Sequence, residues 1–417
     1  MQELFVEGGN RLCGELTIQG SKNGVLPVLA ATILCAGACR IENCPRLRDV
    51  DASIAILRHL GCCTRWEDGA LIVDTTHMDR GEVPDALMRE MRSSVIFLGA
   101  ILARQGEAAL SYPGGCELGP RPVDMHLDAL RRLGAEIRED DGRLIARARA
   151  MTSAEITLRF PSVGATENAM IAACGAEGVT VIRGAAREPE IRDLAAFLEK
   201  TGARVRGAGS GTVTVAAADR PCTAVRHRVI GDRIAAGTWL CAAAATGGRV
   251  RVLGTEPAHL ASLCGVLTQA GCTVRGEADG VLLEAPARLR APQPVVTQPY
   301  PGFPTDLQAP LMAALLRAAG ESVFTETIFR SRYRHVPELA KLGADIVCEG
   351  DRAVVRGVER LHGAAMTATD LRGGAAMLIA ALAAEEKSTV AMAEHIDRGY
   401  ENVEEAFGQL GVRLYRA

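Results

Sequence analysis

The segment VDMHLDALRRLGAEI, residues 123–137, contains the pattern that decides the fold. Three apolar residues, Val123, Leu127 and Leu130, recur at helical spacing. Gly134 follows at the point where a helix end needs a left-handed residue. After this glycine, apolar and polar residues alternate as in a half-buried strand. The segment therefore predicts a surface helix that ends at a glycine and leads directly into a strand.

The same helix–glycine–strand pattern occurs six times along the chain. The glycines lie 68 to 73 residues apart, and they are Gly61, Gly134, Gly202, Gly271, Gly343 and Gly411. Earlier in each repeat, as at 26–36, 235–245 and 374–384, lies a helix rich in Ala and Leu on all sides, which predicts a buried helix. The expected order is strand, buried helix, strand, surface helix, strand, strand. Common solenoid repeats are shorter, at about 20 to 50 residues. We therefore expect three repeats to enclose their buried helices as one domain, and six repeats to form two.

The composition excludes several classes of function. The 417 residues are 48% hydrophobic and carry a net charge of −3, which is typical of a soluble globular protein and gives no global basic field for nucleic acid or a membrane surface. Apolar stretches are too short for a transmembrane helix, and the N-terminus has no signal-peptide pattern. The thirteen cysteines show no metal-ligand spacing. We expect a cytoplasmic protein with reduced thiols, no metal and no cofactor.

The residues that enter the buried helices differ among the six repeats. Four of these helix starts carry a basic residue, and they are Lys22, Arg92, Arg233 and Arg372. Free backbone N–H groups and the helix dipole favour anions at a helix N-terminus, so these positions suit phosphate and carboxylate ligands. Only four lysines occur among the 47 basic residues, which singles out Lys22. The alternative for any single start is ordinary capping by Ser, Thr or Asp.

A loop without regular structure is expected at 111–122, SYPGGCELGPRP, because three glycines and three prolines interrupt it. Its cysteine, Cys116, follows two glycines and precedes Arg121. An exposed thiol in a positive environment suits acid or nucleophile chemistry. His126 lies inside the following helix and is expected to be structural.

Five motifs in order along the chain resemble those of the UDP-N-acetylglucosamine 1-carboxyvinyltransferases, a family of enolpyruvyl transferases. They are GSKN at 20–23, the loop through 113–124, SVGAT at 162–166, FPTD at 303–306 and DRGY at 397–400. The resemblance implies an inside-out α/β barrel fold of two three-repeat domains, with the active site in the cleft between them. It also implies that residues 22–229 form the domain carrying the Cys116 loop, and that residues 1–21 belong with 230–417.

The resemblance further implies a reaction. The enolpyruvyl group of phosphoenolpyruvate moves to the 3′-hydroxyl of UDP-N-acetylglucosamine, phosphate is released, and the product enters peptidoglycan synthesis. The expected catalytic residues are Cys116 as the proton donor, Asp306 as the base and Lys22, and the expected partners are these two small molecules. Lys22, Arg121, Arg372 and Arg398 are expected to hold phosphoenolpyruvate. Asn23 and Arg92 are expected to line the substrate site, and Ile328 is expected to meet the sugar. The residues expected to receive the uridine diphosphate part are Arg121, Pro122, Val123, Asp124, Met125, Ser162, Val163 and Gly164.

Two positions depart from the family pattern. Ala235 and Arg330 stand where the family commonly carries acidic residues. These departures are the support for a non-catalytic paralogue that binds UDP-N-acetylglucosamine. The closest alternative enzyme is 5-enolpyruvylshikimate 3-phosphate synthase, which shares the fold and the donor, although the Cys116 loop and the 121–124 run favour the UDP-sugar. The sequence leaves the oligomeric state open, and a monomer is compatible with it.

Overall fold

The computed structural model describes residues 2–114, 123–219 and 222–417. Contacts between residues group the described chain into two units. The first unit comprises residues 20–114 and 123–230, and the second comprises residues 2–19 and 231–417. The polypeptide therefore passes from one unit to the other after residue 19 and again after residue 230.

The first unit contains three four-stranded sheets. In order across the first sheet, the strands are β16 (Ala224–Arg228), β3 (Ala38–Glu42), β5 (Ala70–Asp74) and β4 (Cys63–Glu67). Across the second sheet they are β6 (Glu82–Val83), β7 (Glu107–Ser111), β9 (Arg143–Arg147) and β8 (Glu136–Asp140). Across the third they are β11 (Glu155–Thr157), β13 (Val179–Arg183), β15 (Thr212–Ala216) and β14 (Arg204–Arg206). A short additional sheet pairs β10 (Met151–Thr152) with β12 (Ala176–Glu177).

The second unit also contains three four-stranded sheets. Their strands are β2 (Cys13–Thr17), β17 (Arg249–Leu253), β19 (Gly280–Glu284) and β18 (Thr273–Glu277); β20 (Val295–Val296), β21 (Glu321–Thr325), β23 (Arg352–Arg356) and β22 (Asp345–Glu349); and β24 (Ala365–Thr367), β25 (Ser388–Ala391), β1 (Glu3–Val6) and β26 (Leu414–Arg416). The last sheet is completed by the N-terminal strand, because Leu4 of β1 pairs with Val390 of β25 and with Arg416 of β26.

All six of these sheets have the same topology. In each, the first strand is parallel to the second, and the later neighbours are antiparallel. The repeat expected from the six glycines is therefore present as six copies of one sheet. Within the described residues the sheets remain separate and do not join into a closed barrel.

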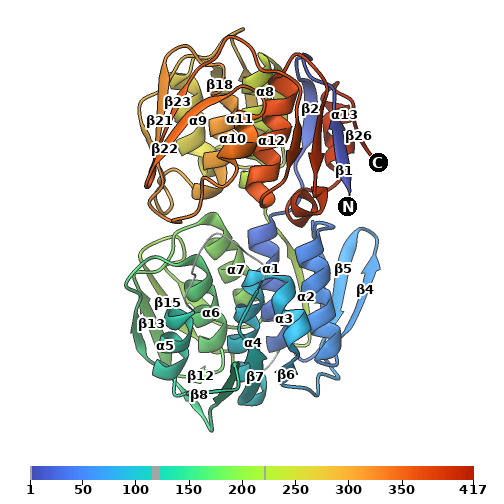
Figure 1. Cartoon of the computed structure of the whole chain (residues 1–417). Coiled ribbons are helices and arrows are strands. Elements are labelled where there is room, and N and C mark those ends of the chain that lie inside the picture. The colour runs from blue at the N-terminus through green and yellow to red at the C-terminus, as the bar shows by residue number, and fades with distance from the viewer. Residues whose placement is uncertain (1, 115–122, 220–221) are drawn as a thin grey trace. The chain divides into compact units, whose positions relative to one another are not determined.

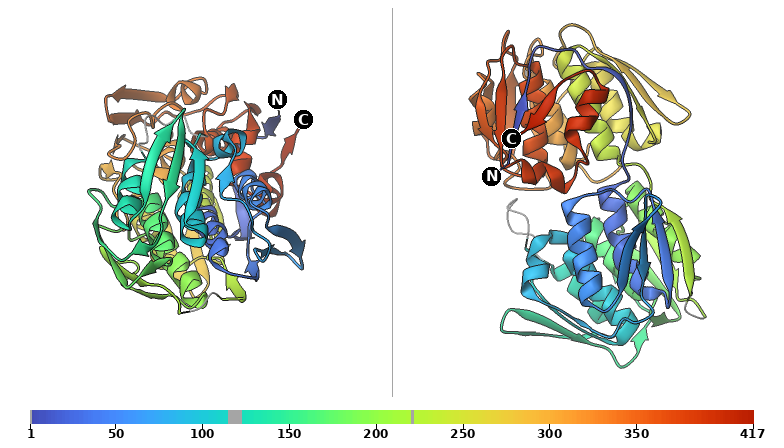
Figure 2. Two further views of the ribbon diagram at one scale, coloured as in Figure 1. Left: turned by 90° about the horizontal axis from the view of Figure 1, so that it is seen from below. Right: turned by 90° about the vertical axis from the view of Figure 1, so that its right-hand side faces the viewer.

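Each unit encloses three helices that contact one another (Figures 1 and 2). The buried helices are α1 (Lys22–Ala31), α4 (Ile96–Gln105) and α6 (Val163–Ala173) in the first unit, and α8 (Arg233–Thr246), α10 (Gln308–Ala314) and α12 (Leu371–Ala383) in the second. Small residues let these helices approach closely. At Gly99 of α4, for example, a Cβ atom would lie 2.1 Å from Oδ1 of Asn168 on α6. The expectation of buried helices inside sheets is confirmed.

A second set of helices lies outside the buried ones and is more amphipathic. These helices are α2 (Arg48–His59), α5 (Asp124–Arg132), α7 (Pro189–Lys200), α9 (Ala261–Gln269), α11 (Val336–Ala340) and α13 (Val403–Gln409). Each is followed by one of the six repeat glycines, and every one of those glycines has a positive φ, between 81° and 104°. The remaining helices are α3 (Asp85–Glu90), η1 (Thr32–Leu34), η2 (Arg92–Val95), η3 (Pro257–Leu260), η4 (Thr305–Leu307) and η5 (Ala393–Arg398).

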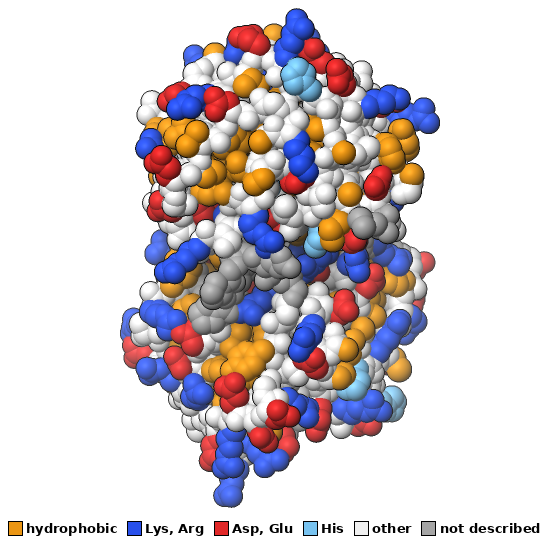
Figure 3. All heavy atoms as spheres, viewed as in Figure 1, with side chains coloured by type: hydrophobic (Ala, Val, Ile, Leu, Met, Phe, Trp, Pro, Cys, Tyr) orange, Lys and Arg blue, Asp and Glu red, His pale blue; other side chains and the backbone are white. Residues whose placement is uncertain are grey.

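Charged side chains of both signs are interspersed on the face drawn in Figure 3, in keeping with the small net charge. Among the described residues, no helix is both long and apolar enough to span a bilayer.

Candidate active site

In the first unit, Lys22 is the first residue of α1. The preceding Ser21 caps the helix, because its Oγ accepts a hydrogen bond of 3.1 Å from the backbone N–H of Gly24. The Lys22 ammonium lies 2.9 Å from Oδ2 of Asp49 on α2, and its side chain is only 14% exposed. The sequence therefore places a largely buried cation at a helix N-terminus, where the backbone also favours an anion. Asn23 follows and is half-buried.

Arg92 begins η2, which leads into the buried helix α4. Its Nη1 donates a hydrogen bond of 3.1 Å to the carbonyl oxygen of Pro113. The next residue, Gly114, lies so close to the backbone of Arg89 that a Cβ atom would approach its Cα within 2.8 Å. The structure thus ties Arg92 to the beginning of the 113–122 loop. Cys116, Arg121 and Pro122 lie outside the described residues.

The expected uridine-binding residues occupy the starts of two helices, α5 and α6. Val123 precedes α5, whose first residues are Asp124 and Met125. Ser162 caps α6, with its Oγ accepting from the backbone N–H of Ala165 at 3.4 Å, and Val163 and Gly164 form the first turn. The Asp124 carboxylate is paired with Arg159, which comes just before the cap of α6. Both segments therefore lie at helix N-termini.

His126 connects these helix starts. The side-chain amide of Asn168 on α6 donates to Nδ1 of His126 at 3.1 Å and to the carbonyl oxygen of Val95 at 3.2 Å. A Cβ atom on Gly164 would lie 3.2 Å from the imidazole. Burial, reinforced by the nearby Arg92 guanidinium, lowers the pKa of His126 to about 4. His126 is therefore a neutral, buried group that links α5 to Asn168 of α6, which supports the structural role expected for it.

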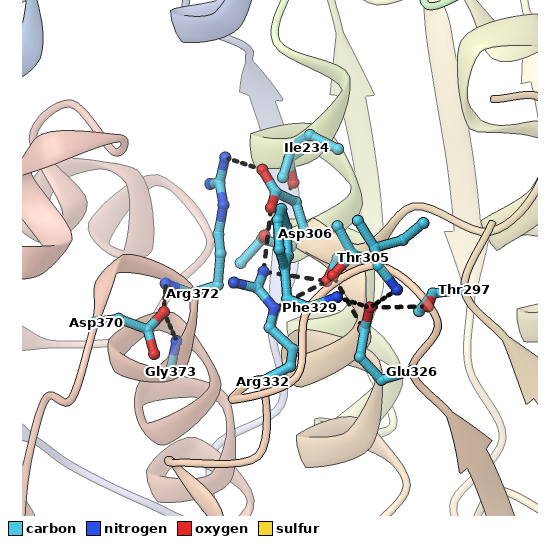
Figure 4. A network of polar contacts seen from close by, with 12 residues as sticks. Ile234, Thr297, Thr305, Asp306, Glu326, Phe329, Arg332, Asp370, Arg372 and Gly373 are labelled. Atoms are coloured by element: carbon cyan, nitrogen blue, oxygen red, sulfur yellow. Dashed lines mark hydrogen bonds and ion pairs between the residues drawn. The ribbon is translucent and has the colours of Figure 1, made fainter. Parts of the chain in front are cut away.

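In the second unit, the Asp306 carboxylate is held between two buried guanidinium groups (Figure 4). Oδ1 of Asp306 lies 3.1 Å from Nη2 of Arg332, and Oδ2 lies 3.2 Å from Nη2 of Arg372. Both arginine side chains are at most 3% exposed, whereas that of Asp306 is 28% exposed. Asp306 lies in η4 at the start of α10, so solvent or a ligand can reach the carboxylate while its partners stay buried.

Arg372 combines deep burial with unused hydrogen-bonding capacity. It lies in the first turn of α12, where Asp370 caps the helix by accepting from the backbone N–H groups of Arg372 and Gly373. Burial lowers the pKa of Arg372, but Tyr400 and Asp306 outweigh this effect and hold it above the ordinary arginine value. Its Nε and Nη1 have no hydrogen-bond partner within the described residues. Because an unpaired buried donor is costly, these atoms suit an anionic ligand.

Glu326 joins the residue before Asp306 to the turn that contains Ile328. Its Oε2 accepts a hydrogen bond of 2.9 Å from the Thr305 hydroxyl, and its Oε1 accepts from the backbone N–H groups of Ile328 and Phe329 at 2.8 and 3.1 Å. Ile328, the expected sugar contact, is therefore anchored to the same carboxylate as the residue before Asp306.

The remaining candidates of the second unit are Arg398 and Arg233. Arg398 is the last residue of η5. It is followed by Gly399 and Tyr400, and the Arg372 guanidinium lies 5.4 Å from the centre of the Tyr400 ring. Arg233 begins α8 after the cap Asp232 and is 6% exposed. Three of the four basic residues expected at helix starts, Lys22, Arg233 and Arg372, are thus buried or nearly so.

Sequence reasoning missed three residues that hold the candidates. Asp49 pairs with Lys22, Arg332 pairs with Asp306, and Glu326 anchors the Ile328 turn. The one available signal was the position of Arg332 and Glu326 within four residues of Ile328. For Asp49 the sequence offers no signal, since its pairing depends on how α1 and α2 pack. Among the described residues, no group of three or more His, Cys, Asp or Glu side chains is arranged to hold a metal ion.

A known protein family and curated relatives match most or all of the chain. Residues 6–407 match the family model described as EPSP synthase (3-phosphoshikimate 1-carboxyvinyltransferase). A UDP-N-acetylglucosamine 1-carboxyvinyltransferase 2 of Caldanaerobacter subterraneus is 46% identical, with 100% of both chains covered. A UDP-N-acetylglucosamine 1-carboxyvinyltransferase 1 of Symbiobacterium thermophilum is 47% identical, covering 100% of this chain and 95% of the relative.

Solved structures with the same fold also cover the whole chain. The crystal structure of the enolpyruvyl transferase NikO from Streptomyces tendae has a TM-score of 0.88 and 26% identity, covering 100% of this chain and 99% of that one. An EPSP synthase from Acinetobacter baumannii has a TM-score of 0.75 and 17% identity over 100% of both chains, a likeness that concerns the fold alone.

Proposed function

The chain belongs to the EPSP synthase family of carboxyvinyltransferases, among the UDP-N-acetylglucosamine 1-carboxyvinyltransferases, and from this we propose its reaction and the residues that perform it. The enzyme transfers the enolpyruvyl group of phosphoenolpyruvate to the 3′-hydroxyl of UDP-N-acetylglucosamine and releases phosphate. This is the first committed step of peptidoglycan synthesis. Both substrates are phosphorylated metabolites of the cell interior, so we place the reaction in the cytoplasm. The proposal requires no cofactor.

The observation that carries the assignment of roles is the contact between Asp306 and Arg372. It joins a carboxylate that a ligand can reach to a buried cation with two unused N–H donors. Phosphoenolpyruvate carries a carboxylate and a phosphate, and an arginine fork binds such groups strongly. Arg372, with Lys22, Arg121 and Arg398, then supplies the positive charge that the donor substrate needs.

The reaction proceeds by addition and elimination. The 3′-oxygen of the sugar bonds to C2 of phosphoenolpyruvate as Asp306 accepts the hydroxyl proton, and Cys116 donates a proton to C3, so that the double bond becomes a methyl group. The methyl group then returns a proton to the Cys116 thiolate, the double bond re-forms, and the bond from C2 to the phosphate oxygen breaks. The proton that Asp306 took from the hydroxyl leaves with the phosphate. Positioned acids and bases of this kind typically contribute about 10²- to 10⁴-fold in rate.

Binding of phosphoenolpyruvate changes what surrounds the base. When the substrate carboxylate or phosphate takes up donors of Arg372, the contact of this arginine with Asp306 is shared or lost. A carboxylate with fewer cationic partners is a better proton acceptor. Asp306 therefore becomes an effective base only after phosphoenolpyruvate has bound.

The function is tested by following phosphate release from phosphoenolpyruvate with two alternative acceptors, UDP-N-acetylglucosamine and shikimate 3-phosphate. We expect release only with the UDP-sugar, and an enolpyruvyl-bearing UDP-sugar in the mass spectrum. Release only with shikimate 3-phosphate would identify the chain as a 5-enolpyruvylshikimate 3-phosphate synthase. A folded protein that binds UDP-N-acetylglucosamine and releases no phosphate would be the non-catalytic paralogue.

A further inference from the structure

Glu326 is a buried carboxylate for which the proposed reaction has no direct use. Its side chain is 4% exposed, and it follows β21 at the point where the chain turns toward Ile328. Burying a carboxylate is costly unless hydrogen bonds compensate it. This carboxylate contacts Thr305, the residue before the candidate base, so its burial there needs a physical explanation.

The partners of Glu326 come from three separate segments. Oε1 accepts from the Thr297 hydroxyl at 3.0 Å and from the backbone N–H groups of Ile328 and Phe329, while Oε2 accepts from the Thr305 hydroxyl. The Thr297 hydroxyl is the donor in the first bond, because a carboxylate oxygen accepts, and Oγ1 of Thr297 accepts in turn from the backbone N–H of Thr327. One side chain thus joins the segment after β20, the turn after β21 and the first residue of η4.

Two of these segments contain residues of the proposed mechanism. Thr305 immediately precedes Asp306, and its carbonyl oxygen accepts from Nε and Nη2 of Arg332, the arginine that also pairs with Asp306. Ile328 lies at the expected sugar contact. The network in Figure 4 therefore runs without interruption from the turn at Phe329 through Glu326, Thr305 and Arg332 to the carboxylate of Asp306.

We infer that Glu326 is a positioning residue that sets the distance between the sugar-binding turn at Ile328 and the base Asp306, acting through the hydroxyl of Thr305. The inference rests on the proposed function, because that function gives Ile328 and Asp306 a common substrate. A hydroxyl and a base must meet at hydrogen-bond distance, and a misplacement of about 1 Å can cost on the order of 10²-fold in rate. Glu326 acts on the acceptor sugar and leaves the donor substrate to its arginine and lysine ligands.

Three variants test this role. Glu326→Gln keeps the shape of the side chain but replaces one acceptor oxygen with a donor group, which then faces donors. Thr305→Val keeps the size of Thr305 and removes its hydroxyl, whereas Thr305→Ser keeps the hydroxyl. The matched control is Glu338→Gln in the same unit, because Glu338 also accepts from a backbone N–H, that of Thr367 at 2.7 Å, and contacts neither Asp306 nor Ile328.

The measurement is steady-state phosphate release with each substrate varied in turn, together with the melting temperature of each variant. We expect Glu326→Gln and Thr305→Val to lose about 10- to 100-fold in kcat/KM for UDP-N-acetylglucosamine, while KM for phosphoenolpyruvate changes less than about threefold. Thr305→Ser restores most of the activity. Because both changes break the same bond, the double variant loses little more than the more impaired single variant.

Two results separate the failure of this inference from failure of the proposed function. An inactive wild-type enzyme would contradict the function itself. An active wild type whose Thr305→Val variant shows wild-type kinetics would overturn the role of Glu326 even if Glu326→Gln fails to fold. A lowered melting temperature with unchanged kcat/KM in both variants would likewise overturn it, since that is the behaviour of a purely structural residue.

Discussion

Oδ2 of Asp306 lies 3.2 Å from Nη2 of Arg372, which joins the candidate base to a candidate ligand of phosphoenolpyruvate. Asp306 lies in η4 and Arg372 in α12, 66 positions apart in the chain. Their contact means that binding of an anion at Arg372 changes the electrostatic surroundings of Asp306. In the proposed mechanism, this one ion pair couples donor binding to activation of the acceptor hydroxyl.

The second partner of Asp306 gives the first prediction. Arg332 donates to the carbonyl oxygen of Thr305 from both Nε and Nη2 and to Asp306 from Nη2, a fixed planar fork that the single nitrogen of a flexible lysine does not reproduce. We expect Arg332→Lys to lower kcat on the order of tenfold, because Asp306 is then less well oriented. Arg330→Lys, two residues away at an exposed position, is the matched control and retains wild-type kcat in the same assay. Equal kcat values for the two variants would refute the role of Arg332.

The second prediction concerns Cys116, whose role rests on the sequence. Cys116→Ser is expected to fold and to bind UDP-N-acetylglucosamine but to lose most of its turnover, because a hydroxyl is a much weaker acid than a thiol. Cys116→Asp retains an acid of similar reach, so it is expected to keep activity and to escape epoxide inhibitors such as fosfomycin, which alkylate the thiol.

The control for these variants is Cys348→Ser at an exposed thiol of β22, which keeps both activity and inhibition. Full turnover of Cys116→Ser would exclude Cys116 as the proton donor.

The third prediction follows from the lowered pKa of His126. Its pKa is about 4 in the folded chain and about 6.5 in an unfolded one. Between these values the unfolded state binds a proton that the folded state does not, so stability is complete above pH 6.5 and falls as the pH decreases toward 4. From pH 7 to pH 5 this group removes about 2 kcal/mol from the free energy of unfolding.

Denaturant unfolding at both pH values checks this effect. His126→Gln cannot take up the proton, so its stability is expected to fall less between pH 7 and pH 5 than that of the wild type. His77→Gln, at an exposed position, serves as the control and follows the wild type. His335, whose pKa burial also lowers to about 4, contributes equally to all three proteins and cancels in the comparison. An identical loss of stability in His126→Gln and the wild type would show that His126 does not titrate in this way.

Local patterns were enough to predict the repeating elements. The six glycines after the surface helices all have a positive φ, because a helix that ends there needs a left-handed residue, and this need is visible in the sequence. Ser21, Asp232 and Asp370 cap their helices, so Lys22, Arg233 and Arg372 stand in the first turns, as the sequence predicts. The assignment of residues 22–229 and of 1–21 with 230–417 to separate domains stays a prediction.

The partners of the site residues were not predictable in this way. Lys22 meets Asp49, and Glu326 meets Thr305, only after separate elements have packed, and no periodicity encodes those meetings. The place of β1 between β25 and β26 depends likewise on the two ends of the chain coming together. Within the site, sequence motifs predicted the residues proposed to carry chemistry and missed those that hold them in position.

The central claim is that Asp306 accepts the proton of the acceptor hydroxyl during enolpyruvyl transfer to UDP-N-acetylglucosamine. The most direct test measures phosphate release from phosphoenolpyruvate by the wild type and by Asp306→Asn at saturating concentrations of both substrates, with binding of UDP-N-acetylglucosamine measured alongside. We predict turnover by the wild type and a kcat lower by about 10² or more in the variant, with binding retained. A variant that turns over at the wild-type rate, or a wild type that binds the UDP-sugar without releasing phosphate, would contradict the account.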